Sequence, residues 1–358
     1  MDEKNRIPLK IYFYHTRTVE QSYEDWKQAR FPGHLLYGMP LFDKHGIKSI
    51  IHRHKHFEKR WRITLHATKE ILTCKEKFDI LYGTSFRGLE LIVFLRALGL
   101  YREPIVIWHH QAIIRNKNKF RGFLSRIFYR GFDHLFFFSN ELINRSIQAN
   151  KFPAAKMELI HWGPDLAFYD QILQDSKKES ERSGFISTGK ENRDVTTLIQ
   201  AFSETGQELE LYISKTCGHI NYEKIISGLP HAENIRIHFT EGVIPYVLAR
   251  KVAEKKFIVI CCLETAYTVG LTTLVEALAL GMPVICSRNP NFGFDIDREG
   301  IGITVPYGDI AGWRNAITYL TEHPEEAAEM GRKARKLAEE RFNLEIFSQE
   351  IAERLHQL

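Results

Sequence analysis

Short apolar runs rich in β-branched residues alternate with longer amphipathic segments along most of the chain. Such runs, each followed by a helical pattern, are typical of βαβ units, in which helices cover both faces of a parallel sheet. The expected strands of the first half are residues 9–14, 47–52, 80–82, 105–108, 134–138 and 157–161. Those of the second half are residues 185–187, 209–213, 235–239, 257–262, 284–286 and 302–305. The pattern predicts an α/β protein with two doubly wound, Rossmann-like sheets.

Two domains are also expected from the length, because 358 residues exceed the usual size of one hydrophobic core. A polar, highly charged stretch separates the two series of strands and is expected to be a linker. The end of the chain has strong helical composition, with a break near Phe342 and Asn343. We therefore expect an N-terminal domain, a linker, a C-terminal domain and a last helix, at residues 1–168, 169–183, 184–340 and 341–358.

Composition narrows the class of protein. The start of the chain lacks the apolar core and cleavage site of a signal peptide, and the longest apolar stretch is shorter than the roughly 20 residues that cross a bilayer. We expect a cytoplasmic protein. The five cysteines have no CxxC spacing and are expected to be reduced structural thiols. His52, His54 and His56 are expected to form a solvated basic loop, and neither a metal nor a cofactor is predicted.

The segment after the strand pattern at residues 257–262 is the strongest candidate site. Ligands of open α/β sheets bind at the carboxyl ends of strands, where loops and helix starts gather. The loop runs through Gly270, which allows a ligand to approach the backbone, and the helix is expected over residues 272–280. Backbone N–H groups at a helix start carry positive partial charge, so this segment is suited to a diphosphate.

Polar side chains at the start of this helix fit a nucleotide. Thr272 and Thr273 add hydroxyl donors, and Glu276, one turn further on, is placed to accept hydrogen bonds from both hydroxyls of a ribose. Alternatively, Thr272 or Thr273 caps the helix and Glu276 is a surface carboxylate. Taken alone, these residues favour the second interpretation.

The segment GLTTLVEALALGMPVICS at residues 270–287, followed by the glycines of residues 300–302 and 308, resembles the C-terminal domain of the retaining GT-B glycosyltransferases of family 4. Two further segments are similar to the same family, at residues 187–202 and 160–165. The resemblance implies a GT-B fold, in which two Rossmann-like domains face each other across a cleft. It also implies that the helix at residues 341–358 crosses back to the N-terminal domain.

The resemblance assigns roles in the second half. The residues it implies for donor binding are Gly270, Leu271, Thr272, Thr273 and Glu276. Lys190 and Arg193 would neutralise the diphosphate as charge develops on the leaving nucleotide, a role for which cations are chemically suited. The family usually has a second glutamate, facing the sugar, eight residues before the ribose glutamate. Thr268 occupies that position here, so either the sugar is held differently or Glu264 on the same loop substitutes.

The first half contains candidates for the sugar and the acceptor. His110 follows Pro104 by six residues, and in the family a histidine at that spacing contacts the donor sugar. A strand-end histidine satisfied by the backbone is the alternative. Gly33, His34 and Gly38 are expected to form a loop near the phosphates and the acceptor, although an ordinary turn fits them equally well.

Residues 117–130 combine positive charge with an apolar stripe. Phe120, Phe123, Leu124, Ile127 and Phe128 follow helical spacing. The stretch from 104 to 132 has no acidic residue, and its basic residues are Arg115, Lys117, Lys119, Arg121, Arg126 and Arg130. A helix of this kind can lie in an anionic membrane interface, close to a lipid-linked acceptor. Alternatively, the stripe packs on the sheet. Nucleic-acid binding is not expected, because no nucleic-acid module accompanies the charges.

The expected function is transfer of a sugar from a nucleoside diphosphate sugar to a hydroxyl of a glycan or lipid-linked glycan, in the synthesis of a cell-surface polysaccharide or glycoconjugate. UDP is the expected nucleotide only because it is the most frequent one among sugar-nucleotide donors. The enzyme would be cytoplasmic and peripheral on the inner face of the membrane. A GT-B sugar-nucleotide 2-epimerase and a non-catalytic subunit that binds a sugar nucleotide are the alternatives.

Overall fold

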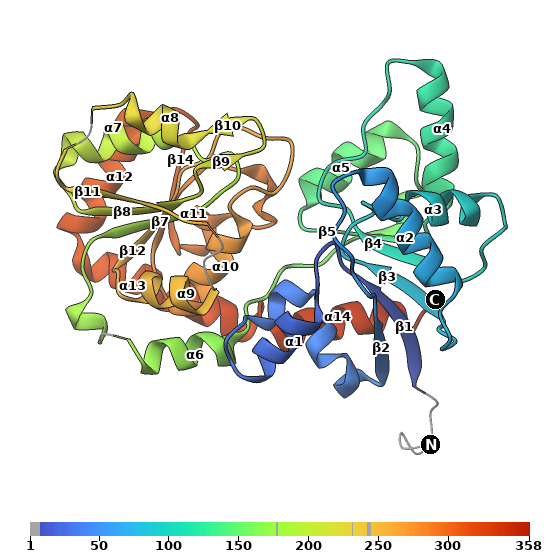
Figure 1. Ribbon diagram of the computed structural model, residues 1–358. Helices are drawn as coiled ribbons and strands as arrows, with labels where there is room; N and C mark the ends of the chain where they lie inside the picture. The colour runs from blue at the N-terminus through green and yellow to red at the C-terminus, as the bar shows by residue number, and fades with distance from the viewer. Residues whose placement is uncertain (1–7, 177, 231, 242–244) are drawn as a thin grey trace. The chain divides into compact units, whose positions relative to one another are not determined.

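The computed structural model in Figure 1 describes residues 8–176, 178–230, 232–241 and 245–358. The chain divides into two compact units. Unit 1 contains Met1–Gln28, Gly33–Trp162 and Leu344–Leu358, and unit 2 contains Ala29–Pro32 and Gly163–Asn343. The first seven residues of the expected N-terminal domain and Lys177 of the expected linker lie outside the described residues. Within the described ranges, no helix is both long enough and apolar enough to span a bilayer.

Unit 1 is built on a six-stranded parallel sheet in the order β2-β1-β3-β4-β5-β6. The strands are β1 (Leu9–Tyr14), β2 (Ile47–Ile51), β3 (Ile80–Gly83), β4 (Ile105–Trp108), β5 (His134–Phe137) and β6 (Met157–Leu159). The helices between them are α1 (Glu20–Lys27), α2 (Arg60–Leu72), α3 (Glu90–Ala97), α4 (Lys119–Arg130) and α5 (Asn140–Ala149). Strands β3, β4 and β5 are buried along their whole length, which explains their continuous apolar sequences.

The last helix, α14 (Leu344–Leu355), belongs to unit 1 although it follows unit 2 in the sequence. The ring of Phe347 lies 5.5 Å from that of Trp108, and Ser348 Oγ donates to the carbonyl oxygen of Gly38 at 2.9 Å. Gly38 precedes the 3₁₀ helix η3 (Met39–His45) with φ at +83°, and a Cβ there would lie 3.0 Å from Ile351 Cδ1. Glycine at this position therefore allows α14 to pack closely.

Unit 2 contains a second six-stranded parallel sheet, in the order β11-β8-β7-β12-β13-β14. The strands are β7 (Phe185–Gly189), β8 (Leu209–Ile213), β11 (Ile235–Phe239), β12 (Phe257–Ile260), β13 (Val284–Ser287) and β14 (Gly302–Val305). The helices are α6 (Leu166–Gln174), α7 (Val195–Thr205), α8 (Tyr222–Ser227), α9 (Pro245–Ala253), α10 (Leu271–Leu280), α11 (Ile296–Glu299), α12 (Ile310–Glu322) and α13 (Pro324–Glu340). A small antiparallel pair, β9 (Thr216–Cys217) and β10 (Ile220–Asn221), follows β8.

The two parallel sheets confirm the predicted fold class, with strand ends within one or two residues of those expected. The boundary between the two units does not coincide with the linker expected at residues 169–183. Residues 166–174 form α6, which is capped by Asp165 and packs against α9 and α10. Its buried residues are Phe168, Tyr169 and Ile172, and the charged stretch that was expected to be a linker begins only after this helix. The chain therefore enters unit 2 at Gly163, before the expected linker.

Candidate functional site

The sheet of unit 2 reverses its winding between β7 and β12, and polar groups gather at this position. Strands β8 and β11 continue the sheet on one side of β7, and β13 and β14 continue it on the side of β12. Doubly wound folds bind ligands beside the carboxyl ends of the two strands at such a switch point. The loops after β7 and β12 are joined there. Asp194 N donates to Cys261 O at 3.0 Å, and Leu263 N donates to Asn192 O at 2.8 Å.

Arg193 lies at the centre of this switch point. Its side chain is buried, with 6% of its surface exposed. Nη2 donates to Thr188 O at 2.9 Å and to Thr273 Oγ1 at 3.2 Å, and Nη1 donates to Cys262 Sγ at 3.3 Å. These bonds bring together the end of β7, the segment after β12 and the first turn of α10, which are far apart in the sequence.

No carboxylate pairs with Arg193 among the described residues, so its guanidinium is hydrogen-bonded only to uncharged acceptors and its charge is not compensated. Burial of a cation without an anion is costly. The backbone is shaped to admit it, because Gly189 has φ at +134° and a Cβ there would overlap the Arg193 guanidinium. Lys190 stands beside it on the same loop, exposed and unpaired within the described ranges. The arrangement is suited to an anionic ligand.

The start of α10 has the geometry of an anion-binding site. The N-cap is Gly270, with φ at +88° and no side-chain hydrogen bond to the first turn, so neither Thr272 nor Thr273 caps the helix. A Cβ at Gly270 would lie 2.6 Å from Ile260 Cγ2, which requires glycine here. Thr272 is exposed, whereas Thr273 and Leu271 are buried. The capping interpretation is therefore wrong, and the N–H groups of this turn are not occupied by a side-chain cap.

Glu276 lies one turn further along α10 and is mostly buried. Burial raises the pKa of its carboxyl from 4.5 to about 8. Its carboxylate has no hydrogen bond or salt bridge within the part of the chain that the structure describes. Tyr169 of α6 lies close enough for the Glu276 charge to raise the pKa of its hydroxyl further above the value set by burial. A ligand with two hydroxyl donors would supply the missing hydrogen bonds.

Thr268 and Glu264 both lie on the loop that leads into α10. Thr268 is partly buried, and the Glu264 side chain is exposed. Two asparagines that follow β13 hold this loop. Asn289 Nδ2 donates to Val269 O at 3.1 Å, and Asn291 Nδ2 donates to Thr265 O at 3.5 Å. Neither asparagine was predicted as part of the site, although polar residues directly after a buried strand are a signal that could have identified them.

His110 follows β4 at the carboxyl edge of the sheet in unit 1. Its Nε2 lies 2.8 Å from Thr84 O, and because a carbonyl oxygen only accepts, Nε2 carries the proton. The Tyr37 ring lies 6.0 Å from His110 and 6.1 Å from His15. Burial, with help from the Arg17 charge, lowers the pKa of His15 to about 4. Tyr37 and His15, neither of which was predicted from the sequence, therefore lie in the neighbourhood of His110.

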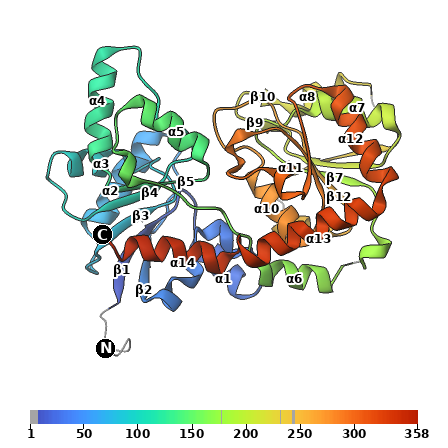
Figure 2. The ribbon, with the colours of Figure 1, turned by 180° about the vertical axis from the view of Figure 1, so that it is seen from behind.

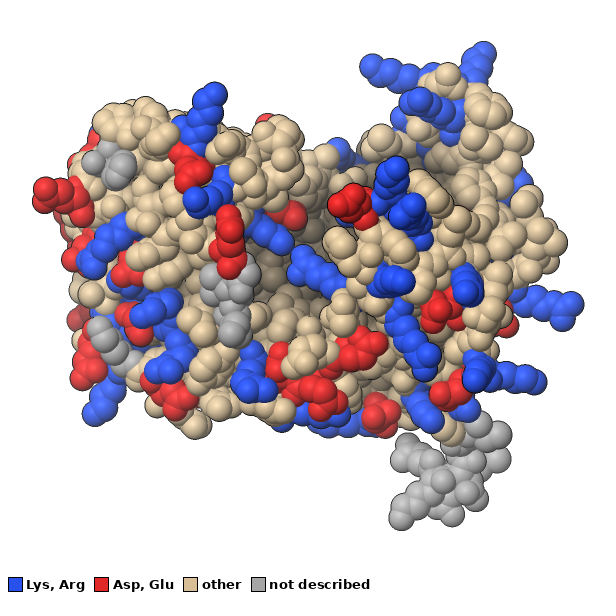
Figure 3. All heavy atoms as spheres, in the orientation of Figure 1, with Lys and Arg blue, Asp and Glu red and all other residues tan. Residues whose placement is uncertain are grey.

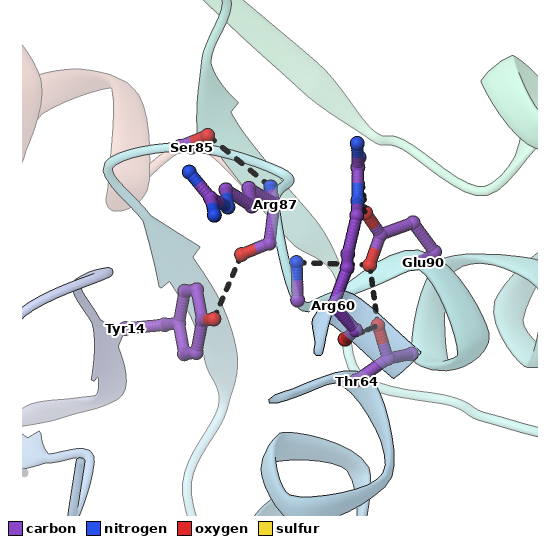
Figure 4. Close-up of polar contacts among 7 residues, drawn as sticks. Tyr14, Arg60, Thr64, Ser85, Arg87 and Glu90 are labelled. Atoms are coloured by element: carbon purple, nitrogen blue, oxygen red, sulfur yellow. Dashed lines mark hydrogen bonds and ion pairs between the residues drawn. The ribbon is translucent and has the colours of Figure 1, made fainter. Parts of the chain in front are cut away.

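The neighbouring loop after β3 is held by the Glu90 carboxylate (Figure 4). The donors to Glu90 are Arg60 Nε at 2.7 Å, Thr64 Oγ1 at 2.8 Å and Gly88 N at 2.8 Å. Tyr14 hydroxyl donates to Arg87 O at 2.8 Å, and a Cβ on Gly88 would overlap that hydroxyl. The loop is therefore tightly constrained while the Arg87 side chain remains exposed.

The three residues expected in a loop near the phosphates and the acceptor, Gly33, His34 and Gly38, make contacts within unit 1. His34 is 1% exposed, and its carbonyl oxygen accepts from Trp162 Nε1 at 2.9 Å. Burial lowers the pKa of His34 to about 3, so its ring stays neutral. Gly33 begins the same 3₁₀ turn, η2 (Gly33–Leu36), and Gly38 contacts α14 as described. His52, expected in a solvated loop, is instead buried, with Nδ1 2.8 Å from the Tyr12 hydroxyl.

Comparison with known proteins gives matches in structure alone. No protein-family model matches the chain, and no curated protein matches it. Anabaena Alr3699/HepE in complex with UDP is 15% identical, with a TM-score of 0.68 over 98% of this chain and 100% of its own. A sucrose-phosphate synthase from Thermosynechococcus elongatus is 14% identical, with a TM-score of 0.70 over 98% and 99%. A UDP-forming α,α-trehalose-phosphate synthase from Burkholderia vietnamiensis is 11% identical, with a TM-score of 0.73 over 99% and 100%.

The fold is GT-B. Both sheets of this chain and the alternation of strands and helices match the two Rossmann-like domains of these glycosyltransferase structures. The expectation of a GT-B fold is thereby confirmed. Within it, unit 2 brings together the expected donor residues Lys190, Arg193, Gly270 and Thr273 at one switch point, with Glu276 one turn away. His110 belongs to the edge of the other domain.

Proposed function

We propose that this protein is a glycosyltransferase that moves a sugar from a UDP-sugar to a hydroxyl of a glycan or lipid-linked glycan. The observation that carries the proposal is the buried guanidinium of Arg193, which has no carboxylate partner among the described residues and contacts the first turn of α10. An anionic diphosphate would compensate that charge. UDP is supported by the similar structures, since HepE is described in complex with UDP and UDP-glucose and the trehalose-phosphate synthase as UDP-forming.

The proposed donor site uses three kinds of contact. Arg193 and Lys190 bind the diphosphate, together with the N–H groups at the start of α10. Glu276 accepts hydrogen bonds from the ribose hydroxyls. Thr268 and Glu264 are the proposed candidates for contacts with the sugar. For His110, a sugar contact is proposed on the family resemblance alone.

The proposed chemistry is a substitution at the anomeric carbon. The acceptor hydroxyl oxygen forms a bond to this carbon while its bond to the diphosphate oxygen breaks. The electron pair leaves with UDP, and the hydroxyl proton passes to an oxygen of the leaving diphosphate. The cations at residues 190 and 193 stabilise the negative charge that develops there. Retention of configuration, as in family 4, requires attack on the face from which UDP departs.

An acceptor-dependent turnover assay tests this proposal. Full-length protein is incubated with UDP-, GDP- or ADP-sugars, with and without glycans or membrane extract, and release of the nucleoside diphosphate is measured. We expect UDP release that requires an acceptor. Glu276→Ala should reduce it about tenfold or more, because a hydrogen-bonded charge is lost. The matched control is Glu322→Ala, which removes an exposed glutamate at the end of α12.

The other outcomes contradict the proposal in distinguishable ways. Conversion of the UDP-sugar to its epimer without an acceptor would indicate a sugar-nucleotide 2-epimerase. Tight binding of a sugar nucleotide with no turnover on any acceptor would indicate a non-catalytic binding subunit. If Glu276→Ala left turnover unchanged, the assignment of the ribose site would be wrong.

A further inference from the structure

Helix α4 presents an apolar stripe to solvent. Tyr129 is its only buried residue, whereas Phe120 and Phe123 are 67% and 59% exposed. Leu124 is 38% exposed, and Ile114 in the preceding loop is 67% exposed. The helix extends away from the sheet of unit 1 in both views (Figures 1 and 2). The interpretation that the whole stripe packs on the sheet is therefore wrong for its N-terminal half.

This surface is held rigidly in place. At its C-terminal end, the Phe128 ring lies 5.3 Å from that of Phe94 and 5.2 Å from that of Phe132, and Phe128 packs against the core of the unit. Lys151 Nζ donates to Ile114 O in the preceding loop at 2.6 Å and to Ser125 Oγ in the middle of α4 at 3.0 Å. The loop and the helix are thereby fixed to each other, so the apolar side chains are presented on a fixed scaffold.

The charges around the stripe are all positive and unpaired. The basic residues on this segment are Arg115, Lys117, Lys119, Arg121, Arg126 and Arg130. None of the six forms a salt bridge with any residue in the described ranges. Figure 3 shows Lys and Arg side chains gathered on the projection formed by α4. We name Ile114, Phe120, Phe123 and Leu124, together with these six residues, the α4 surface.

A cavity of about 540 Å³ adjoins the α4 surface at Ile114 and Arg115. Its lining combines the side chains of Arg115 and Arg145 with apolar groups and contains no carboxylate. Arg145 forms no salt bridge within the described part of the chain. Two guanidinium groups beside apolar walls are chemically suited to a phosphate group attached to a hydrocarbon chain.

We propose that the α4 surface docks on a membrane of anionic phospholipids. Aromatic and aliphatic side chains between unpaired basic residues are the features of helices that lie in the headgroup region. A second copy of this chain is a poorer occupant, because pairing two such surfaces would place like charges against one another. Docking would bring the enzyme to acceptors carried by lipids, and it does not depend on the transfer reaction itself.

Vesicle sedimentation with the full-length protein tests the proposal. Phosphatidylcholine vesicles are compared with vesicles that also contain phosphatidylglycerol. We expect binding to the anionic vesicles only, weakened by salt. Phe120→Ser/Phe123→Ser should weaken binding about tenfold or more, because it removes apolar area that would enter the membrane. Arg121→Gln/Arg126→Gln should weaken binding by a similar factor, because it removes positive charge. The matched control is Trp61→Ser/Leu65→Ser on α2, where both side chains are also more than half exposed.

A second readout separates loss of docking from loss of folding. Thermal unfolding of each variant should match that of the wild type, because the replaced side chains are exposed. Phe120→Trp should shift its emission to shorter wavelength when anionic vesicles are added. The proposal is overturned if the wild type ignores anionic vesicles, if both double variants bind as it does, or if the control loses binding equally. Dimerisation that Phe120→Ser/Phe123→Ser abolishes, without lipid binding by the wild type, would assign the surface to a second copy.

Discussion

Glutamine in place of Glu276 is expected to stabilise the protein at neutral and alkaline pH. Burial raises the pKa of this carboxyl from 4.5 to about 8, and no hydrogen bond compensates within the described ranges. The folded state therefore holds the proton more tightly than the unfolded chain does. Its stability consequently falls as pH rises from about 4.5 to about 8, because ionisation is easier once the chain unfolds. Glutamine has nearly the same shape and carries no charge.

The size of the effect follows from the two pKa values. At pH 7 the medium lies about 2.5 pH units above the unfolded pKa, and each unit is worth about 1.4 kcal/mol, which gives an upper bound of roughly 3.5 kcal/mol. Glu276 retains some contact with solvent, so a gain of about 1–2 kcal/mol is expected near pH 7–8. For a unit of this size, that corresponds to a rise in Tm of roughly 2–8 °C. Near pH 4 the variant and the wild type should be equally stable.

Thermal unfolding of both proteins across this pH range is the assay, without nucleotide. The matched control is Glu322→Gln, an exposed glutamate on α12, which should leave the curve unchanged at every pH. A stability difference that is the same at low and high pH would refute the reasoning. So would a variant that is less stable than the wild type near pH 8, because the carboxylate would then be making a favourable contact.

Three further outcomes are expected. Gly189→Ala should weaken UDP binding about tenfold or more in calorimetry, because the added methyl displaces the Arg193 guanidinium and φ is +134°; unchanged affinity would contradict this. UDP-sugar binding near pH 7 should release a proton, since ribose hydroxyls favour the charged form of Glu276. A binding enthalpy that is the same in buffers of different ionisation enthalpy would rule out this proton release. Gly38→Ala should destabilise the protein by about 1–3 kcal/mol in urea unfolding, more than Gly46→Ala, which also has positive φ but no neighbour within 4 Å.

The sheets and the polar segments that meet at the switch point of unit 2 were predictable from the sequence. Buried parallel strands have continuous apolar sequences, and the segments after them were recognisable at Lys190 and Gly270. The family resemblance placed Arg193 in the same site. It could not show that Thr273 and Cys262 hold the guanidinium, because these contacts join segments that are about 70 to 80 residues apart. Contacts of that kind depend on strand order, which local patterns do not encode.

The predictions for α6, His52 and α4 differ from the structure because the sequence did not show which side chains are buried. The α6 helix was expected as part of a linker, but Phe168, Tyr169 and Ile172 pack within unit 2. His52 was expected in solvent, yet its ring is buried beside Tyr12. At α4, periodicity predicted an amphipathic helix and could not decide whether its stripe faces the core. A periodic pattern identifies an apolar face, but only tertiary packing determines what covers it.

Titration of UDP into the wild type and Arg193→Met, followed by calorimetry, tests the central claim most directly. The account predicts one binding site per chain in the wild type. It also predicts that Arg193→Met weakens binding about a hundredfold, because a buried cation that pairs with the diphosphate is lost. The variant should remain folded, since methionine fills similar volume without the unpaired charge. Equal UDP affinity in the folded variant and the wild type, or the absence of nucleotide binding by the wild type, would contradict the account.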